Sequence, residues 1–176
     1  MIRSLCVYCG SNFGADPAFA EATRELAQRL VERDIRLVYG GSATGLMGTL
    51  ADTALAAGGT VVGVIPQGLV DREIAHRGLS DLRVVGSMHE RKAQMAELAD
   101  GFIAVPGGIG TLEELIEVYT WSQLGIHDKG CGVLNTRGYY DGLAAFLDHA
   151  VQEGFLRAQH RAVLTVAKTP PTCSTR

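Results

Sequence analysis

Short apolar runs alternate with longer segments of helical periodicity along the whole chain. The runs are rich in Val, Ile and Leu and lack the strict alternation of a half-buried strand. Such runs are typical of strands that are covered on both faces, as in a parallel sheet. The expected strands are 5–9, 36–39, 60–65, 82–85, 101–105, 132–135 and 163–166, and the expected helices are 17–33, 45–57, 88–99, 112–124 and 139–153.

This regular alternation of strand and helix predicts an α/β fold, because a crossover helix joins each pair of parallel strands. We expect a single doubly wound, Rossmann-like domain over 1–168, with a parallel sheet of about seven strands and helices on both faces. The polar, proline-containing segment 169–176 is expected to be a flexible tail. In such a sheet the ligand lies beyond the carboxyl ends of the strands, where strand order reverses.

Composition and charge narrow the class of partner. The chain of 176 residues is 47% hydrophobic and has a formal net charge of −3, so it offers no basic surface for nucleic acid or an anionic membrane. No apolar run approaches the ~18 residues of a membrane span, and the first run is too short for a signal peptide. We expect a cytoplasmic protein whose partner is a small molecule.

A metal or redox site is not expected at the cysteines. Cys6 and Cys9 have the CxxC spacing, but two residues three apart in a strand point to opposite faces of the sheet. The sequence has no second pair with the spacing of a zinc site.

Two glycine-rich loops follow expected strands and lead into expected helices. The first is Gly40-Gly41-Ser42-Ala43-Thr44-Gly45-Leu46-Met47-Gly48, and the second is Pro106-Gly107-Gly108-Ile109-Gly110-Thr111. At a helix N-terminus the free backbone N–H groups and the helix dipole favour an anion, and glycine lets a ligand approach the backbone. Both loops could instead be tight turns, but two in one small sheet favour a phosphate or nucleotide site.

Two common nucleotide-binding modes do not fit these loops. A dinucleotide fold needs GxGxxG after the first strand and an acid roughly 20 residues later, yet Cys9-Gly10-Ser11-Asn12 follows the first expected strand. Neither loop matches the GxxxxGK[ST] pattern of a triphosphate-binding loop.

Arg91 is a candidate for contact with an anion. Ser87 and Glu90 have the spacing of a capping box, which places the helix start at this point. Arg91 then lies on the buried face of the helix, one turn from its N-terminus, where a guanidinium must find an anion or reach water past the helix end.

Two neighbouring carboxylates compete for a role in the second glycine loop. Thr111 and Glu114 also have capping-box spacing, so that on local pattern alone Glu114 is expected to bond the backbone of Thr111. A carboxylate beside a phosphate is nevertheless repelled unless a cation or the chemistry requires it. Glu113 is an alternative, and the local pattern leaves the choice open.

The segments MHERK at 88–92 and PGGIGTLEE at 106–114 make the chain resemble a known family. CGS at 9–11, YGGSATGLMG at 39–48, GVIP at 63–66 and WSQLGIHDK at 121–129 extend this resemblance over nearly the whole chain. The family is Lonely Guy, the cytokinin riboside 5′-monophosphate phosphoribohydrolases once labelled lysine decarboxylases. The resemblance implies hydrolysis of the bond between base and ribose in a nucleoside 5′-monophosphate, and a homodimer without metal or organic cofactor.

The resemblance also implies roles for individual residues. Arg91 and Glu114 would be the catalytic pair, and Gly108, Gly110 and Thr111 would hold the substrate phosphate. The remaining residues expected to contact substrate are Ser11, Gly41, Glu73, Met88, Lys92, Gly107, Ile109, Leu112, Glu113 and Thr120. The base pocket is expected to involve apolar residues near Met88, Met95 and Trp121, and the sequence leaves open which of them line it.

Two other activities fit the sequence less well. Pyridoxal-phosphate decarboxylation needs a lysine for the Schiff base, and none of Lys92, Lys129 and Lys168 stands in an evident cofactor site. A non-catalytic nucleotide carrier would use the same phosphate loops, but it would gain nothing from a carboxylate at Glu114.

Overall fold

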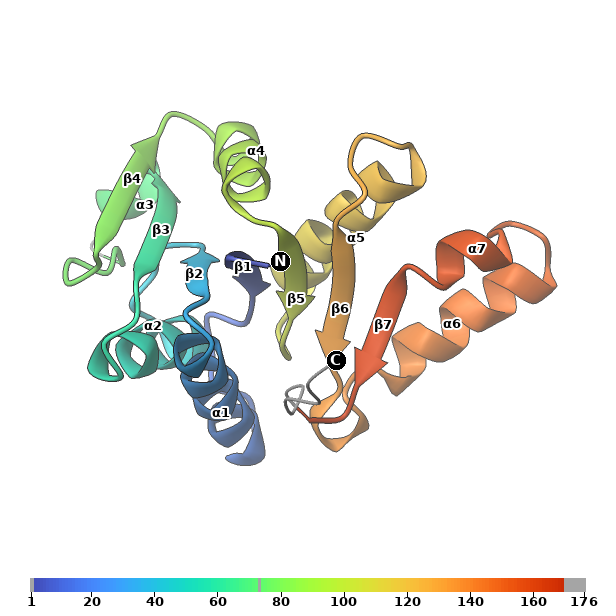
Figure 1. The fold of residues 1–176 in the computed structure, drawn as a ribbon, viewed down its shortest axis with the longest axis horizontal. Helices are drawn as coiled ribbons and strands as arrows, with labels where there is room; N and C mark the ends of the chain where they lie inside the picture. The colour runs from blue at the N-terminus through green and yellow to red at the C-terminus, as the bar shows by residue number, and fades with distance from the viewer. Residues whose placement is uncertain (1, 73, 170–176) are drawn as a thin grey trace.

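The computed structural model describes residues 2–72 and 74–169, and one seven-stranded sheet runs through them (Figure 1). All strand pairs are parallel, in the order β4-β3-β2-β1-β5-β6-β7. The strands are β1 (Ser4–Tyr8), β2 (Arg36–Tyr39), β3 (Val61–Pro66), β4 (Asp81–Val85), β5 (Gly101–Ala104), β6 (Gly130–Leu134) and β7 (Leu164–Ala167). The helices are α1 (Ala18–Glu32), α2 (Gly45–Ala56), α3 (Gln67–Val70), α4 (Met88–Leu98), α5 (Ile109–Gln123), η1 (Thr136–Gly138), α6 (Asp141–Gln152) and α7 (Ala158–Arg161).

The predicted α/β fold with a seven-stranded parallel sheet is confirmed. Each expected strand lies within two residues of its predicted bounds. The short elements α3, η1 and α7 were not predicted, because segments of three or four residues carry no periodicity. The start of α5 was placed wrongly: the helix begins at Ile109 and not at 112.

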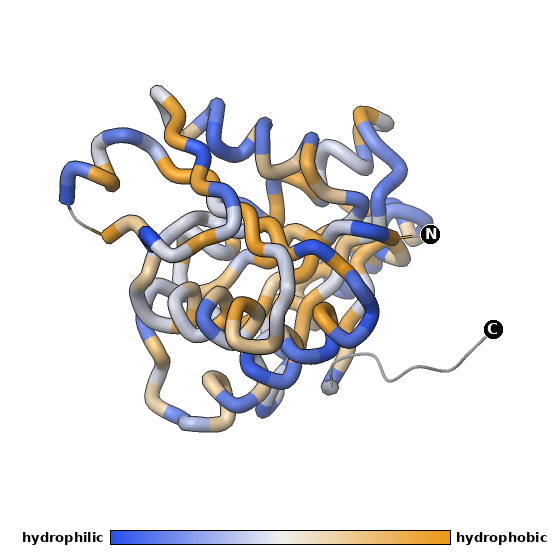
Figure 2. The backbone as a smooth tube through the Cα atoms, turned by 60° about the vertical axis from the view of Figure 1, so that its left-hand side comes forward, coloured by the Kyte–Doolittle hydropathy of each residue, from blue (hydrophilic) through white to orange (hydrophobic). Residues whose placement is uncertain are grey.

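Helices cover both faces of the sheet and divide the core in two. On one face, Leu26 of α1 and Leu50 of α2 pack against the strands. On the other face, Met95 of α4, Leu115 of α5 and Leu147 of α6 do so. In Figure 2 many hydrophobic segments lie toward the interior and many hydrophilic segments lie on the outer turns.

The burial of each strand follows its place in the sheet. Every residue of β1 and β3 is buried, which explains why their sequences are continuous apolar runs. The edge strands β4 and β7 are partly exposed and carry polar residues. Among the described residues, no helix combines the length and the apolar character needed to cross a membrane.

The cysteines of the CxxC spacing lie on opposite faces, as the strand geometry requires. Cys6 packs in the core beneath α4 and α5, and Cys9 packs in the core beneath α1 and α2. Both are free thiols, and burial raises the pKa of each thiol above its ordinary value.

The order of the strands reverses between β1 and β5. The chain runs outward from β1 through β2 and β3 to β4, returns to β5, and then runs the other way to β7. The helices that follow these two neighbours, α1 and α5, therefore lie on opposite faces of the sheet. The loops after β1 and β5 separate above the sheet and leave a crevice, the position where doubly wound folds bind ligands.

Packing on the α2 face can be tested with two leucines. Leu50 is fully buried and Leu124 is 67% exposed. Leu50→Ala is expected to lower the free energy of unfolding by about 2–5 kcal/mol, because it leaves a cavity in the core. Leu124→Ala is expected to change it by less than about 0.5 kcal/mol. Chemical denaturation measures both, and equal losses would contradict the assignment of the core.

Candidate active site

Helix α4 starts at the position that Ser87 predicted. The Ser87 hydroxyl oxygen accepts a hydrogen bond from the backbone N–H of Glu90 at 3.1 Å. The Glu90 carboxylate accepts from Gly86 N at 2.8 Å, one residue before the partner in a standard capping box. This start places Arg91 one turn into α4 on its buried face.

The Arg91 guanidinium does not reach water past the helix end, because it has buried acceptors on three elements. Its Nη1 lies 3.0 Å from Glu114 Oε1 on α5. Its Nε donates to the carbonyl of Val64 on β3 at 2.9 Å, and its Nη2 donates to the carbonyl of Gly40 after β2 at 3.2 Å. The side chain of Arg91 is 8% exposed, so these bonds replace its hydration.

Gly40 is required by the arginine rather than by a turn. A Cβ at this position would collide with Arg91 Nη2 and would lie 3.3 Å from the sulfur of Met47. Glycine therefore admits the guanidinium to the end of β2.

Glu114 faces Arg91 and does not cap its own helix. Helix α5 begins at Ile109 with Gly108 as its N-cap, so Thr111 lies inside the first turn and the predicted capping role of Glu114 is wrong. Burial raises the pKa of Glu114 above its ordinary value, while the charge of Arg91 acts in the opposite direction. The carboxylate is thus a buried acid whose ionised form depends on the arginine beside it.

Lys92 joins the two other carboxylates of α5. Its ammonium lies 2.5 Å from Glu113 Oε1 and 3.1 Å from Glu117 Oε2. The hydrogen bond to Glu113 raises the pKa of Lys92, which outweighs the opposite effect of burial. Lys92 therefore holds α4 against α5 beside the Arg91–Glu114 pair.

A cavity of about 290 Å³ opens at the crevice between β1 and β5. Nine residues predicted from the sequence line it: Ser11, Met88, Arg91, Gly108, Ile109, Gly110, Thr111, Glu113 and Glu114. Cys9, Gly10 and Met47, which were not among the predicted site residues, complete the lining. Cys9 and Gly10 follow β1 directly, so their position after the first strand was the available signal.

The N-terminus of α5 opens into this cavity without a side-chain cap. The first intrahelical bond runs from Leu112 N to Gly108 O, at 3.2 Å. The N–H groups of Ile109, Gly110 and Thr111 therefore have no intrahelical acceptor. Such a group of N–H donors at the positive end of a helix is suited to bind a phosphate.

The glycines of the two loops differ in what surrounds them. In the first loop, a Cβ at Gly45 would collide with the backbone of Ser11, and one at Gly48 would collide with Ala43. In the second loop a Cβ at Gly107 would collide with Thr111, but at Gly108 and Gly110 no atom beyond the neighbouring backbone lies within 4 Å of the Cβ position. The open glycines of the second loop mark the place where a ligand can approach the backbone.

The other predicted residues that the structure describes lie outside this cavity. Gly41 has a left-handed φ of +75° and accepts a hydrogen bond from His76 N at 2.8 Å. Leu112 packs against the core, and the Thr120 hydroxyl donates to the carbonyl of Ile116 at 2.7 Å. Glu73 lies outside the described residues.

Of the apolar residues expected near the base, one lines the cavity and two do not. Met88 lines the cavity and is 44% exposed. Met95 is fully buried in the core and Trp121 packs against that core, so neither lines the cavity. The sequence left open which of the three residues line the base pocket; of the three, only Met88 lines this cavity.

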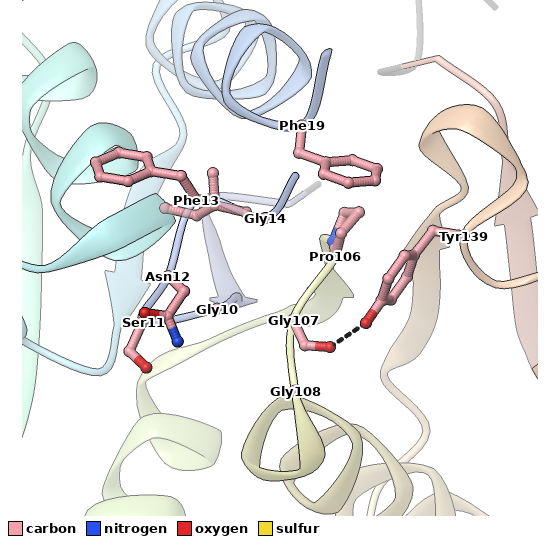
Figure 3. A pocket seen from close by; sticks show the side chains of 11 residues that line it. Gly10, Ser11, Asn12, Phe13, Gly14, Phe19, Pro106, Gly107, Gly108 and Tyr139 are labelled. Atoms are coloured by element: carbon pink, nitrogen blue, oxygen red, sulfur yellow. Dashed lines mark hydrogen bonds between the residues drawn. The ribbon is translucent and has the colours of Figure 1, made fainter. Parts of the chain in front are cut away.

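A second cavity, of about 250 Å³, is lined by residues on both sides of the Pro106–Gly108 segment (Figure 3). It shares Gly10, Ser11 and Gly108 with the first cavity. Gly107, a predicted site residue, lines this cavity and not the first. The remaining lining residues are Asn12, Phe13, Gly14, Phe19, Leu46, Pro106 and Tyr139.

Metal ligands do not cluster in the part of the chain that the structure describes. Over 2–72 and 74–169, no group of three or more His, Cys, Asp and Glu side chains is placed to hold a metal ion.

The fit between Gly40 and Arg91 generates a prediction. Gly40→Ala is expected to displace the guanidinium and to lower the free energy of unfolding by about 1–3 kcal/mol. Gly142→Ala is the control, because no atom lies within 4 Å of its Cβ position inside α6 and alanine favours a helix by roughly 1 kcal/mol. Denaturation curves measure the free energy of unfolding of each variant, and a crystal structure shows the position of Arg91. If Gly40→Ala is as stable as the wild type and Arg91 is not displaced, then Gly40 is not needed to admit the guanidinium.

Similar proteins were found by both sequence and structure. The family model described as "possible lysine decarboxylase" matches residues 47–175. The cytokinin riboside 5′-monophosphate phosphoribohydrolase LOG of Oryza sativa subsp. japonica is 50% identical over 95% of this chain and 69% of its own length. LOG3 of Arabidopsis thaliana, which has the same enzyme name, is 48% identical over 95% of this chain and 78% of its own.

Solved structures share the fold at lower identity. The structural-genomics target TM1055 matches with a TM-score of 0.73 at 23% identity, over 96% of this chain and 94% of its own. The molybdenum cofactor (Moco) carrier protein of Chlamydomonas reinhardtii matches with a TM-score of 0.72 at 19% identity, over 97% of this chain and 91% of its own. The family model covers most of the chain, and the two plant relatives are 48% and 50% identical to it. This chain therefore belongs to the Lonely Guy family, and its relatives in that family are named cytokinin riboside 5′-monophosphate phosphoribohydrolases.

Proposed function

We propose that this protein hydrolyses the N-glycosidic bond of a nucleoside 5′-monophosphate and releases the free base and ribose 5-phosphate. One observation carries the proposal: the buried Glu114 carboxylate, paired with Arg91 at 3.0 Å, lines the same cavity as the uncapped N-terminus of α5. A carboxylate for the chemistry and an anion site for the phosphate are thus within one small space. The names of the relatives support the same reaction.

The phosphate is held at the start of α5 in this proposal. The N–H groups of Ile109, Gly110 and Thr111 supply donors, and the helix dipole adds a favourable field. Gly108 and Gly110 leave open space, so phosphate oxygens can approach the backbone. With the phosphate at this end of the cavity, the ribose lies toward Glu114.

Glu114 serves the reacting carbon. As the bond between C1′ and the base nitrogen breaks, its electron pair leaves with the base and positive charge develops on the ribose ring. The ionised Glu114 stabilises that charge and accepts a proton from the water whose oxygen bonds to C1′. The leaving base nitrogen takes up a proton from solvent, and Glu114 afterwards releases to solvent the proton it took from water, so that atoms and charge balance.

Arg91 keeps Glu114 ionised and oriented. Its bonds to Val64 and Gly40 fix the guanidinium, and the guanidinium fixes the carboxylate. A bonded, water-excluded pair of this kind is preorganised, so little rearrangement is needed when charge develops.

We further propose AMP or an N6-substituted AMP as substrate and a cytoplasmic homodimer as the working form. Met88 gives the cavity an exposed apolar wall that suits a base. The exposed apolar side chains of Phe146 and Phe155 offer surface for a second copy. The free buried thiols suit a reducing compartment.

Release of free base tests the reaction directly. AMP and isopentenyl-AMP are incubated with the wild-type protein and with Glu114→Ala, and the products are separated by chromatography. We expect base and ribose 5-phosphate from the wild type alone. If the wild type binds AMP by calorimetry but releases no base, the protein is a nucleotide carrier and the proposal fails.

The two neighbouring carboxylates are expected to respond differently to removal of their charge. Glu114→Gln should lower kcat by about 10²- to 10⁴-fold, because the amide cannot accept a proton. Glu113→Gln should keep kcat within about tenfold of the wild type, because that carboxylate is half exposed and paired with Lys92. Steady-state kinetics with AMP measure kcat for both variants. If Glu113→Gln loses more kcat than Glu114→Gln, Glu113 is the catalytic carboxylate.

The pH dependence of kcat reports on the same carboxylate. Activity should fall as the pH drops through the raised pKa of Glu114, because only the ionised form accepts a proton. Lys92→Met removes a charge that lowers the pKa of Glu114, so the acid limb should move to higher pH. Glu113→Gln removes a charge that raises this pKa, so the limb should move to lower pH. Shifts in the same direction would refute this electrostatic account.

A further inference from the structure

Tyr139 contacts the glycine loop from outside the catalytic cavity. It stands between η1 and α6, and its hydroxyl donates a hydrogen bond to the carbonyl of Gly107 at 2.5 Å (Figure 3). Tyr139 lines the second cavity and not the one that holds Arg91 and Glu114. None of the roles discussed above uses this residue.

Two aromatic neighbours fix the ring of Tyr139. The ring of Phe19 meets it edge-on, with centroids 5.7 Å apart and planes at 75°. The ring of Tyr140 meets it at 90°, with centroids 5.1 Å apart. Edge-to-face contacts of this kind favour a defined ring position, so the hydroxyl is held where the Gly107 carbonyl lies.

The bond to the Gly107 carbonyl also sets the direction of the next N–H group. The carbonyl of Gly107 and the N–H of Gly108 belong to one planar, trans peptide unit, in which the two groups point in opposite directions. Because the carbonyl is turned toward Tyr139, the Gly108 N–H is turned to the other side of the loop, where Ser11 lies in Figure 3. Ser11 and Gly108 line the catalytic cavity as well as the second cavity, at the place where the two meet.

Glycine makes this peptide unit dependent on an outside restraint. At Gly108 no atom beyond its chain neighbours lies within 4 Å of the Cβ position, whereas a Cβ at Gly107 would collide with the Thr111 side chain and with Gly10 N. A peptide between two glycines can rotate at low steric cost. The Tyr139 hydroxyl restrains the carbonyl side of this peptide.

We propose that Tyr139 is a positioning residue for the substrate phosphate, because its hydroxyl holds the Gly107–Gly108 peptide with the Gly108 N–H directed into the catalytic cavity. This inference rests on the proposed function, in which a nucleoside 5′-monophosphate occupies that cavity. The Gly108 N–H then adds one donor to those of Ile109, Gly110 and Thr111. Tyr139 acts through the backbone and does not touch the substrate.

The neighbouring tyrosine provides a matched control. Tyr140 is 2% exposed, and its hydroxyl donates to the carbonyl of Val105 at 2.8 Å, at the end of β5. Tyr139 is 46% exposed. Removal of the Tyr140 hydroxyl leaves a buried acceptor without its partner and should mainly affect stability. Removal of the Tyr139 hydroxyl should mainly affect phosphate binding.

The test compares Tyr139→Phe with Tyr140→Phe in three measurements: Tm, steady-state kinetics with AMP, and the Kd of ribose 5-phosphate by calorimetry. For Tyr139→Phe we expect KM and Kd to rise roughly three- to tenfold, the change that one lost hydrogen bond brings, with kcat within twofold and little change in Tm. For Tyr140→Phe we expect a lower Tm and an unchanged Kd.

The outcomes separate this inference from the proposed function. An unchanged Kd in Tyr139→Phe overturns the inference, as does an equal rise in Kd for Tyr140→Phe. A wild type that binds ribose 5-phosphate but hydrolyses no nucleotide overturns the proposed function, and the Kd comparison still decides the role of Tyr139. If Tyr139→Phe does not fold, the wild-type Gly108 amide signal in NMR decides: a shift on addition of ribose 5-phosphate supports the inference, and no shift overturns it.

Discussion

The buried ion pair between Arg91 and Glu114 is the interaction on which the rest of the site depends. A guanidinium that is 8% exposed cannot remain in the interior unless its charge and its N–H groups are all satisfied. Its partners come from α5, β3 and the end of β2, three segments far apart in the sequence. This one side chain therefore holds the helix that supplies the carboxylate in register with the sheet.

Several otherwise unrelated features of the chain follow from that pair. The Ser87 cap sets the start of α4, so that Arg91 falls on the inner face. Gly40 leaves room for the guanidinium, and Lys92 balances the two carboxylates that flank Glu114 in the sequence. A buried pair of this kind contributes less stability than apolar packing of the same volume would, which is the expected compromise at a site built for chemistry.

The sequence predicted the sheet well and the site in part. Continuous apolar runs located the strands, because burial on both faces leaves a strong signal. The start of α5 was missed because Thr111 and Glu114 imitate a capping box, while the actual N-cap is Gly108, which has no side chain to identify it. The roles of Gly40 and Tyr139 depend on contacts across 51 and 32 positions of the chain, which no local pattern reveals.

The pairing of β1 with β5 also determines when the ligand site can form during synthesis of the chain. Cys6 pairs with Phe102, so the two strands that flank the crevice meet only after about 95 intervening residues have been made. During synthesis, β1 to β4 and their helices can pair locally, whereas the crevice has only one of its two walls until β5 is inserted. The ligand site is therefore expected to be absent from every nascent chain that lacks β5 and α5, and to form when these two elements are inserted. Occupancy by a nucleotide would then report the insertion of β5 and α5 rather than the pairing of the first four strands.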